Sequence, residues 1–155
     1  MGDIEFNSAL ITGGAGFIGS HLAEKLVGEG IETKILDNFA TGKKDNLLGC
    51  IDKQNFSLFD LDLGKLGNQE DYLENVETVF HMAADPEVRT GYDNPKNSFE
   101  QNIVNTFNLL QKIKHSKVKK IVFTSSSSVY GDAKILPTNE EYGPCLLYTS
   151  DAADE

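Results

Sequence analysis

The sequence has few cysteines, few prolines and no long apolar run. Its 155 residues contain two Cys and four Pro, which excludes a disulfide framework and a proline-rich low-complexity chain. No apolar stretch approaches the roughly 20 residues that a membrane-spanning helix needs. The opening residues, MGDIEF, lack the charged and then apolar pattern of a secretory signal. We therefore expect a cytoplasmic protein with no membrane partner.

Basic residues are also scarce. The chain has 14 Lys and Arg against 24 Asp and Glu, a formal net charge of −10. This balance argues against nucleic acid as a partner. The hydrophobic share of 39% and the length suit about one globular domain with a real core.

Short β-rich apolar runs alternate with amphipathic stretches. Strands are predicted over residues 6–12, 33–37, 56–59, 78–81 and 120–124. Helices are predicted from 17 to about 28–30, around 69–73 and from about 96 to 115. This alternation implies parallel strands joined by right-handed crossovers, an α/β fold with a doubly wound parallel sheet. The apolar faces of the two main helices are expected to consist of Phe17, Ile18, His21, Leu22 and Leu26, and of Phe99, Ile103, Val104, Phe107, Leu110 and Ile113.

A glycine-rich segment, TGGAGFIG at residues 12–19, lies between the first predicted strand and helix. Gly13 would allow the tight turn, Gly16 would let the backbone approach a pyrophosphate, and Gly19 would permit close packing of helix on strand. The following helix N-terminus would offer N–H groups to the phosphates. The alternative reading is a glycine-rich turn without a ligand.

Asp37 ends the second predicted strand, eighteen residues beyond Gly19. A carboxylate there accepts hydrogen bonds from a ribose diol and repels a 2′-phosphate, so NAD is favoured over NADP. A solvated strand-end Asp is the alternative. Lys43 and Lys44 follow closely, and we interpret them as surface or phosphate-side charges.

Six motifs follow one another in order: TGGAGFIGSHL, LDNFATGK, FDLD, HMAA, QNIVNT and TSSSSVYG. Together they resemble the extended short-chain dehydrogenase/reductase superfamily, its NAD-dependent epimerase/dehydratase group, and most of all the nucleotide-sugar epimerases of the UDP-glucose 4-epimerase type. The resemblance runs from residue 7 to residue 144. It implies a Rossmann-type domain, NAD as cofactor, a nucleotide sugar such as a UDP-hexose as substrate, no metal, and a homodimer.

The resemblance also assigns residues to the cofactor. Besides the glycines and Asp37, the cofactor contacts it implies are Phe17, Ile18, Asn38, Asp60, Leu61, Ala83, Ala84 and Asn102. Simpler interpretations stay open: an exposed turn carboxylate for Asp60, a packing requirement for the two alanines, and a solvent-facing side chain for Asn102. His81 is expected to be a core residue with satisfied hydrogen bonds.

The serine run follows the last predicted strand. By resemblance, the catalytic hydroxyl falls on Ser126, four residues before Tyr130, where it would hydrogen-bond the reacting sugar oxygen. Sugar dehydratases of the superfamily carry Asp-Glu directly after that hydroxyl, but here the positions hold Ser127 and Ser128. The pattern therefore favours epimerisation or simple redox chemistry over dehydration.

The family's Tyr-x-x-x-Lys pair is missing. Tyr148 lies near the expected distance, but the residue four later is Ala152. Residues 145–155 also resemble the translation of a sequencing adapter, so we expect residues 1–144 to be the N-terminal part of an NAD-binding domain and 145–155 to be a non-native tail. The C-terminal substrate domain would then be absent and the chain inactive. The rival hypotheses are a sugar-nucleotide dehydratase or decarboxylase, and a non-catalytic NAD(H)-binding protein.

Overall fold

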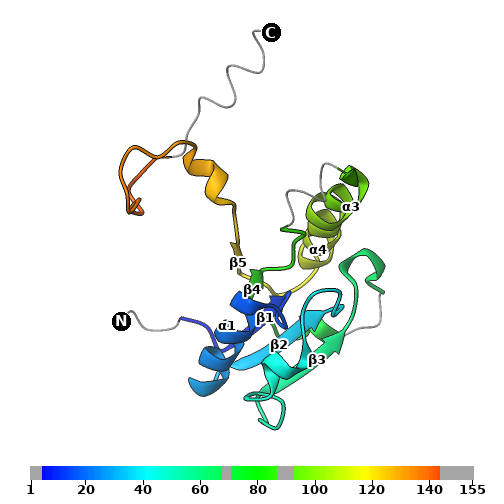
Figure 1. Cartoon of the computed structure of the whole chain (residues 1–155). Helices are drawn as coiled ribbons and strands as arrows, with labels where there is room; N and C mark the ends of the chain where they lie inside the picture. The colour runs from blue at the N-terminus through cyan, green and yellow to red at the C-terminus, as the bar shows by residue number, and fades with distance from the viewer. Residues whose placement is uncertain (1–4, 68–70, 87–92, 144–155) are drawn as a thin grey trace. The chain divides into compact units, whose positions relative to one another are not determined.

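A computed structural model describes residues 5–67, 71–86 and 93–143 (Figure 1). The chain divides into two compact units, Met1–Phe123 and Thr124–Glu155. The predicted junction at Pro144 and the suspected tail, Tyr148 included, lie outside the described residues and stay predictions. Within the described residues, no helix is long and apolar enough to cross a membrane.

The first unit contains a five-stranded sheet in the order β3-β2-β1-β4-β5, with every neighbouring pair parallel. The strands are β1 (Ser8–Thr12), β2 (Glu32–Asp37), β3 (Phe56–Asp60), β4 (Thr78–His81) and β5 (Lys120–Phe123). The chain starts in the middle of the sheet, moves outward to β3, and returns to add β4 on the other side of β1. The predicted doubly wound parallel sheet is confirmed.

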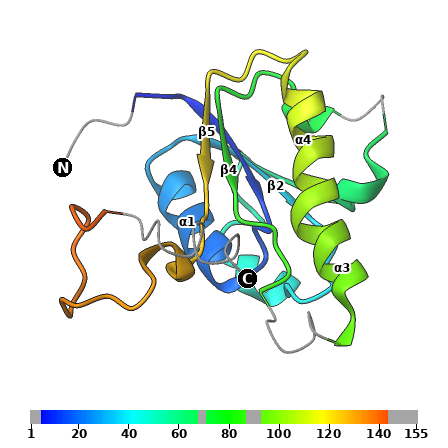
Figure 2. The ribbon, with the colours of Figure 1, turned by 90° about the horizontal axis from the view of Figure 1, so that it is seen from above.

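Helices cover both faces of this sheet (Figure 2). Helix α1 (Phe17–Gly28) follows β1 in the sequence and covers one face. The opposite face is covered by the segment that connects β4 to β5, which consists of α3 (Pro95–Phe99), a π-helical turn (Glu100–Val104) and α4 (Asn105–Ile113). Short 3₁₀ turns occupy the remaining connections at Lys44–Leu47, Leu63–Lys65 and Asp71–Leu73.

The core has two halves because successive strand residues point to opposite faces. In β1, Ile11 packs in the cluster that includes α1, while Leu10 packs in the cluster that includes Leu109 and Ile113 of α4. Both strand residues are fully buried. A continuous apolar run such as ALI is therefore what a strand covered on both faces requires.

The buried face of α1 differs from the one predicted. Phe17 and Ile18 are 80% and 60% exposed, and the helix buries Gly19, Ser20 and Ala23 instead, together with Leu26 and Val27. Small side chains bring the first turns of α1 close to the glycine-rich turn, so the bulky pair at the N-terminus stays outside. The prediction of Leu26 as a core residue is confirmed.

The long second helix also differs in its details. It is interrupted by the π-helical turn Glu100–Val104, which inserts an extra residue and rotates the faces on either side. The helix buries Asn105, Leu109 and Ile113, so the prediction is confirmed for Ile113. It is wrong for Phe99, Ile103, Phe107 and Leu110, which are exposed. A pattern based on 3.6 residues per turn cannot predict such an extra residue.

The second unit is described only over residues 124–143. It contains one 3₁₀ turn, Ser127–Tyr130. The rings of Tyr130 and Tyr142 lie 6.2 Å apart in an edge-on arrangement, and the Lys134 backbone N–H donates to the Tyr142 hydroxyl at 3.3 Å. The serine run that follows β5 thus leads into a short 3₁₀ turn.

Candidate functional site

The turn from β1 to α1 needs glycine at Gly13 for two reasons. Its φ is +68°, a conformation that L side chains rarely adopt. A Cβ there would also lie 2.7 Å from the Ala83 backbone nitrogen. The Gly13 N–H donates to the Leu36 carbonyl at 2.8 Å, so the turn is tied to β2 as well as pressed against the end of β4.

Gly16 and Gly19 complete this turn. A Cβ at Gly19 would clash with the Gly13 carbonyl oxygen and lie 2.7 Å from the Gly14 Cα, so glycine is needed for helix and turn to meet. Gly16 caps α1 without a side-chain hydrogen bond. The helix N-terminus therefore keeps its N–H groups and partial positive charge for an anion, and a pyrophosphate fits this arrangement.

Asp37 lies directly beside the turn. Its side chain is buried, at 7% exposure. One carboxylate oxygen accepts from the Ala15 N–H at 2.9 Å and the other from the Phe39 N–H at 2.8 Å. The solvated strand-end alternative is therefore wrong for this residue. Each oxygen still has a lone pair for a further donor such as a ribose hydroxyl.

The ends of β2 and β3 lie side by side. Asp60 is the parallel partner of Asp37, and the Leu61 N–H donates to the Asp37 carbonyl at 3.1 Å. Asp60 is exposed and forms an ion pair of 3.6 Å with Lys44, whose ammonium lies 4.9 Å from the Phe39 ring centroid. Lys44 thus meets a carboxylate and a ring face at the same edge.

The Asn38 side chain holds its own loop in place. Its Nδ2 donates to Asp62 at 2.7 Å, and its Oδ1 accepts from the Ala40 N–H at 3.0 Å. These hydrogen bonds fix the turn that follows Asp37 and join it to Asp62, just beyond the end of β3.

The end of β4 closes the other side of the edge. The Ala83 N–H donates to the Thr12 hydroxyl at 3.4 Å, and Ala84 is exposed. Asn102, in the π-helical turn, accepts from the Asp85 N–H at 2.7 Å and donates to the Asp85 carbonyl at 3.1 Å. Asn102 therefore fastens the helix to the β4 loop, a role that its sequence position alone did not indicate.

The structure brings most of the predicted residues together at the carboxyl edge of the sheet. They are Gly13, Gly16, Phe17, Ile18, Gly19, Asp37, Asn38, Asp60, Leu61, Ala83 and Ala84, with Asn102 joined to them through the β4 loop. Ser126 belongs to the second unit, where its carbonyl accepts from the Val129 N–H at 3.1 Å.

Thr12 and Thr106 were missed by the sequence interpretation. The His81 ring lies between them, with Nδ1 2.6 Å from the Thr12 hydroxyl and Nε2 2.9 Å from the Thr106 hydroxyl. His81 is 3% exposed, so its prediction as a satisfied core residue is confirmed. The only available signal was the position of Thr12 immediately before the glycines.

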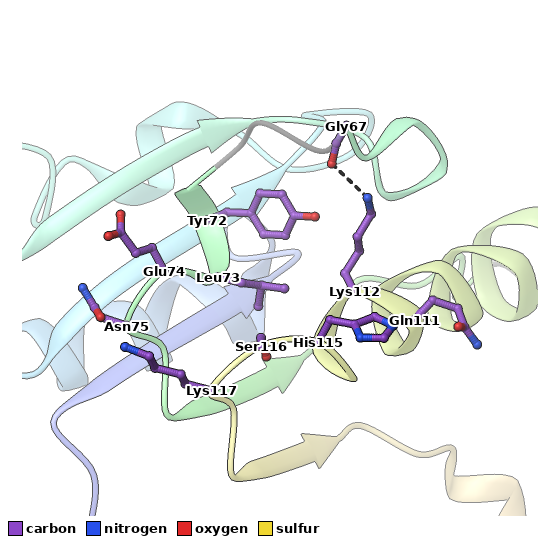
Figure 3. Close-up of a pocket in the computed structure, with 10 residues that line it drawn as sticks. All are labelled: Gly67, Tyr72, Leu73, Glu74, Asn75, Gln111, Lys112, His115, Ser116 and Lys117. Carbon is purple, nitrogen blue, oxygen red and sulfur yellow. Dashed lines mark hydrogen bonds between the residues drawn. The ribbon is translucent and has the colours of Figure 1, made fainter.

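A separate pocket of about 490 Å³ lies near the amino ends of β4 and β5 (Figure 3). Tyr72, Lys112 and His115 are among its lining residues, and the Lys112 ammonium donates to the Gly67 carbonyl at 3.0 Å. No residue predicted for the site lines this pocket. Open α/β sheets bind ligands at the carboxyl ends of their strands, so the edge with Gly13 and Asp37 is the better candidate.

Fold and turn together define a Rossmann-type dinucleotide-binding domain. Residues 10–146 match the family model described as GDP-mannose 4,6 dehydratase. The chain belongs to this family, within the NAD-dependent epimerase/dehydratase group of the extended short-chain dehydrogenases/reductases.

Two curated relatives illustrate the range of the family. The chain is 40% identical over 134 residues to a putative UDP-glucose 4-epimerase of Methanocaldococcus jannaschii, covering 86% of this chain and 43% of the relative. It is 38% identical over 133 residues to UDP-glucuronic acid decarboxylase 1 of Danio rerio, covering 86% and 30%. The chain therefore spans less than half the length of either relative.

Solved structures agree with the fold. A UDP-galactose 4-epimerase superposes with a TM-score of 0.69 at 38% identity, covering 89% of this chain and 44% of that one. The Thermus thermophilus UDP-glucose 4-epimerase, solved as a complex with NAD, gives a TM-score of 0.72 at 33% identity with the same coverages.

Proposed function

We propose that this chain is the NAD-binding part of a cytoplasmic nucleotide-sugar 4-epimerase of the UDP-glucose type. The observation that carries the proposal is the buried Asp37 carboxylate, fixed by the Ala15 and Phe39 amides beside the glycine-rich turn. The similarity to epimerases in sequence and structure supports it.

Each residue at the edge has a role in this proposal. Gly16 lets the backbone approach the pyrophosphate, and the Phe17 and Ile18 N–H groups at the N-terminus of α1 bind it. The Gly16 N–H itself donates to the Gly13 carbonyl at 3.1 Å. Asp37 and Asn38 hold the adenosine ribose.

The remaining contacts lie on either side of β1. Asp60 accepts from the adenine amino group next to Leu61, and the small Ala83 and Ala84 leave room for the nicotinamide half. Asn102 holds the loop after β4 in place through its two hydrogen bonds to the Asp85 backbone.

When bound, NAD supplies transient oxidation at the sugar C4 and return of the hydride. Ser126 hydrogen-bonds the reacting sugar oxygen. The parent protein contributes the Tyr-x-x-x-Lys pair and the sugar-binding domain, so the 155-residue chain by itself is inactive.

The residues favour NAD over NADP. A 2′-phosphate would approach the Asp37 carboxylate, which is held in place by two backbone donors and cannot turn away. Lys44, a nearby cation, forms an ion pair with Asp60. Calorimetric titration of the parent with both cofactors tests this preference, and comparable affinities would contradict it.

Exposed apolar surface in the first unit supports a longer parent. The β5 residues Ile121, Val122 and Phe123 are 39%, 38% and 58% exposed, although both faces of a parallel sheet are normally covered. We assign this surface to strands and helices of the parent beyond the described residues. The exposed helix face of Phe99, Ile103, Phe107 and Leu110 supports a homodimer of the parent.

A decarboxylase is the second candidate, because UDP-glucuronic acid decarboxylases are 37–39% identical to this chain. The two activities differ in substrate and product. The parent should be incubated with UDP-glucose and, separately, with UDP-glucuronate. The proposal expects a UDP-hexose epimer from the first and no CO₂ from the second. Release of CO₂ would establish the decarboxylase, and loss of water from the UDP-hexose would establish a dehydratase.

A further inference from the structure

A chain of hydrogen bonds runs through His81 from α4 to the turn that starts the candidate site. Thr106 donates its hydroxyl proton to the Asn102 carbonyl at 2.8 Å, and its oxygen lies 2.9 Å from His81 Nε2. His81 Nδ1 lies 2.6 Å from the Thr12 hydroxyl, which accepts from the Ala83 N–H at 3.4 Å. Three elements that are far apart in sequence are thus joined by one imidazole ring.

The direction of each bond follows from its neighbours. A carbonyl only accepts, so the Thr106 proton is committed to Asn102 and the Thr106 oxygen must accept from Nε2–H. A neutral ring with hydrogen on Nε2 has a bare Nδ1, which accepts the Thr12 proton. The Thr12 oxygen can then accept the Ala83 N–H. Every donor and acceptor in the chain has one partner in this arrangement.

The series of hydrogen bonds through His81 ends at Ala83, where the backbone packs most closely against the glycine-rich turn. Ala83 is the residue against which Gly13 packs, because a Cβ on Gly13 would lie 2.7 Å from the Ala83 nitrogen. A shift of Ala83 therefore moves or crowds the glycine-rich turn. At the other end, Asn102 fastens the β4 loop through Asp85. The loop after β4 is therefore held at Ala83 by Thr12 and at Asp85 by Asn102.

We propose that His81 is a positioning residue of the cofactor site: as the neutral Nε2–H tautomer it links Thr106 of α4 to Thr12 and so sets the position of Ala83 against Gly13. The inference rests on the proposed function, in that the positioned edge is the one assigned to NAD. His81 does not touch the cofactor in this scheme.

The environment of the ring supports the neutral form. Burial lowers the pKa of His81, and no charged neighbour adds to this shift. The ring forms hydrogen bonds with Thr12 from β1 and Thr106 from α4, and the Phe123 ring from β5 has its centroid 5.5 Å away. None of these three side chains carries a charge near neutral pH.

The tautomer can be read directly in the 155-residue chain. Long-range proton–nitrogen NMR spectra of the imidazoles distinguish Nε2–H from Nδ1–H, and a His81→Asn variant identifies the His81 signals among those of the three histidines. The inference expects a neutral Nε2–H ring at pH 7. An Nδ1–H tautomer or a charged ring at that pH would overturn it.

Variants of Thr106 test the positioning. Thr106→Val removes the acceptor of Nε2–H without touching Ala83, so the inference expects faster exchange of the Ala83 amide hydrogen, about tenfold for one lost hydrogen bond. Thr106→Ser keeps the hydroxyl and should restore the slow exchange. Thr33→Val is the matched control, because Thr33 is buried in β2 and its hydroxyl donates to the nearby Ile31 carbonyl, away from His81 and Ala83.

Binding of NAD separates this inference from the proposed function. We expect Thr106→Val to weaken NAD binding several-fold and Thr106→Ser to restore it. Unchanged Ala83 exchange in Thr106→Val would refute the positioning role. If the unmodified chain binds no NAD, the proposed function fails, whereas the tautomer and the exchange rates still decide whether His81 positions Ala83.

Discussion

The Asp37 carboxylate accepts a hydrogen bond of 2.9 Å from the Ala15 backbone N–H, 22 residues earlier in the chain. This bond joins the end of β2 to the centre of the glycine-rich turn. Gly42 covers the pair, since a Cβ there would lie 2.9 Å from the Ala15 Cβ and 3.0 Å from an Asp37 oxygen. The acidic residue and the turn are therefore joined by a hydrogen bond and packed closely under Gly42.

Replacement of Asp37 by Asn should affect both folding and cofactor choice. An amide has one oxygen, so either Ala15 or Phe39 loses its acceptor, and we expect a loss of about 1–3 kcal/mol in the free energy of unfolding. The variant should also discriminate less between NAD and NADP. Denaturant unfolding and calorimetry measure these effects. Asp45→Asn, the same change at an exposed position, should leave both unchanged.

Two glycines of α1 should respond in opposite ways to alanine. Gly19→Ala places a Cβ against the Gly13 and Gly14 backbone, so we expect severe destabilisation, on the order of 3 kcal/mol or more, from overpacking. Gly28→Ala meets nothing within 4 Å and should be neutral or stabilising by about 0.5–1 kcal/mol. Thermal unfolding compares them. Equal effects would contradict the packing described for Gly19.

Gly16→Ala should separate binding from folding. Its Cβ would meet only the Gly13 carbonyl oxygen, at 3.2 Å, so a small shift accommodates it and the fold survives. The added methyl group stands where the pyrophosphate approaches, and NAD affinity should fall about tenfold or more. A variant that folds and binds NAD as tightly as the unmodified chain would rule out this position for the pyrophosphate.

Stability should depend on pH through His81. Its pKa is lowered in the folded state by burial, so the unfolded chain takes up the proton first. The contribution of the neutral His81 ring to the free energy of unfolding is complete above its unfolded pKa of about 6.5. It is lost as the pH falls from there through the folded pKa. Melting temperatures at pH 7.5 and pH 5.5 measure this loss, and His81→Asn should show a smaller difference between them.

Glu77 contributes to the pH dependence of stability in a separate, lower pH range. Its pKa is lowered first by the Asn7 N–H and then by Lys119, so its contribution is lost as the pH falls below about 4.5.

In the intact parent, Ser126→Ala should depress kcat by about 10²-fold while NAD binding stays nearly unchanged, since its proposed partner is the reacting sugar oxygen. Ser127→Ala, the adjacent exposed serine, is the matched control and should keep near-normal turnover. A normal kcat in Ser126→Ala would show that the catalytic hydroxyl belongs to another serine of the run.

The sheet could be predicted because its strands are short β-rich apolar runs separated by turn residues, and all five were placed within two residues at each end. The helix faces could be predicted only in part, since Leu26 and Ile113 are buried as expected but most of the other predicted positions are exposed. Phe17 and Ile18 look like core residues by spacing, yet the tight glycine-rich turn selects small residues for the buried side of α1. The π-helical turn at Glu100–Val104 likewise leaves no periodic signal.

The glycines and Asp37 could be predicted because each occupies a position that the backbone itself dictates. The hydrogen bonds around Asn102 and His81 depend instead on which elements meet in space, and no spacing in the sequence reports them. The resemblance to a family supplied Asn102 as a site residue, but its two bonds to Asp85 emerge only from the structure.

Titration of the ¹⁵N-labelled 155-residue chain with NAD and with NADP tests the central claim most directly. The amide signals of Gly13, Gly16 and Gly19 report the pyrophosphate, and those of Ala15 and Phe39 report the Asp37 carboxylate to which they donate. Our account predicts that these signals shift together and saturate at a lower concentration of NAD than of NADP. Equal affinity for the two cofactors, or shifts confined to the pocket of Tyr72 and His115, would contradict it.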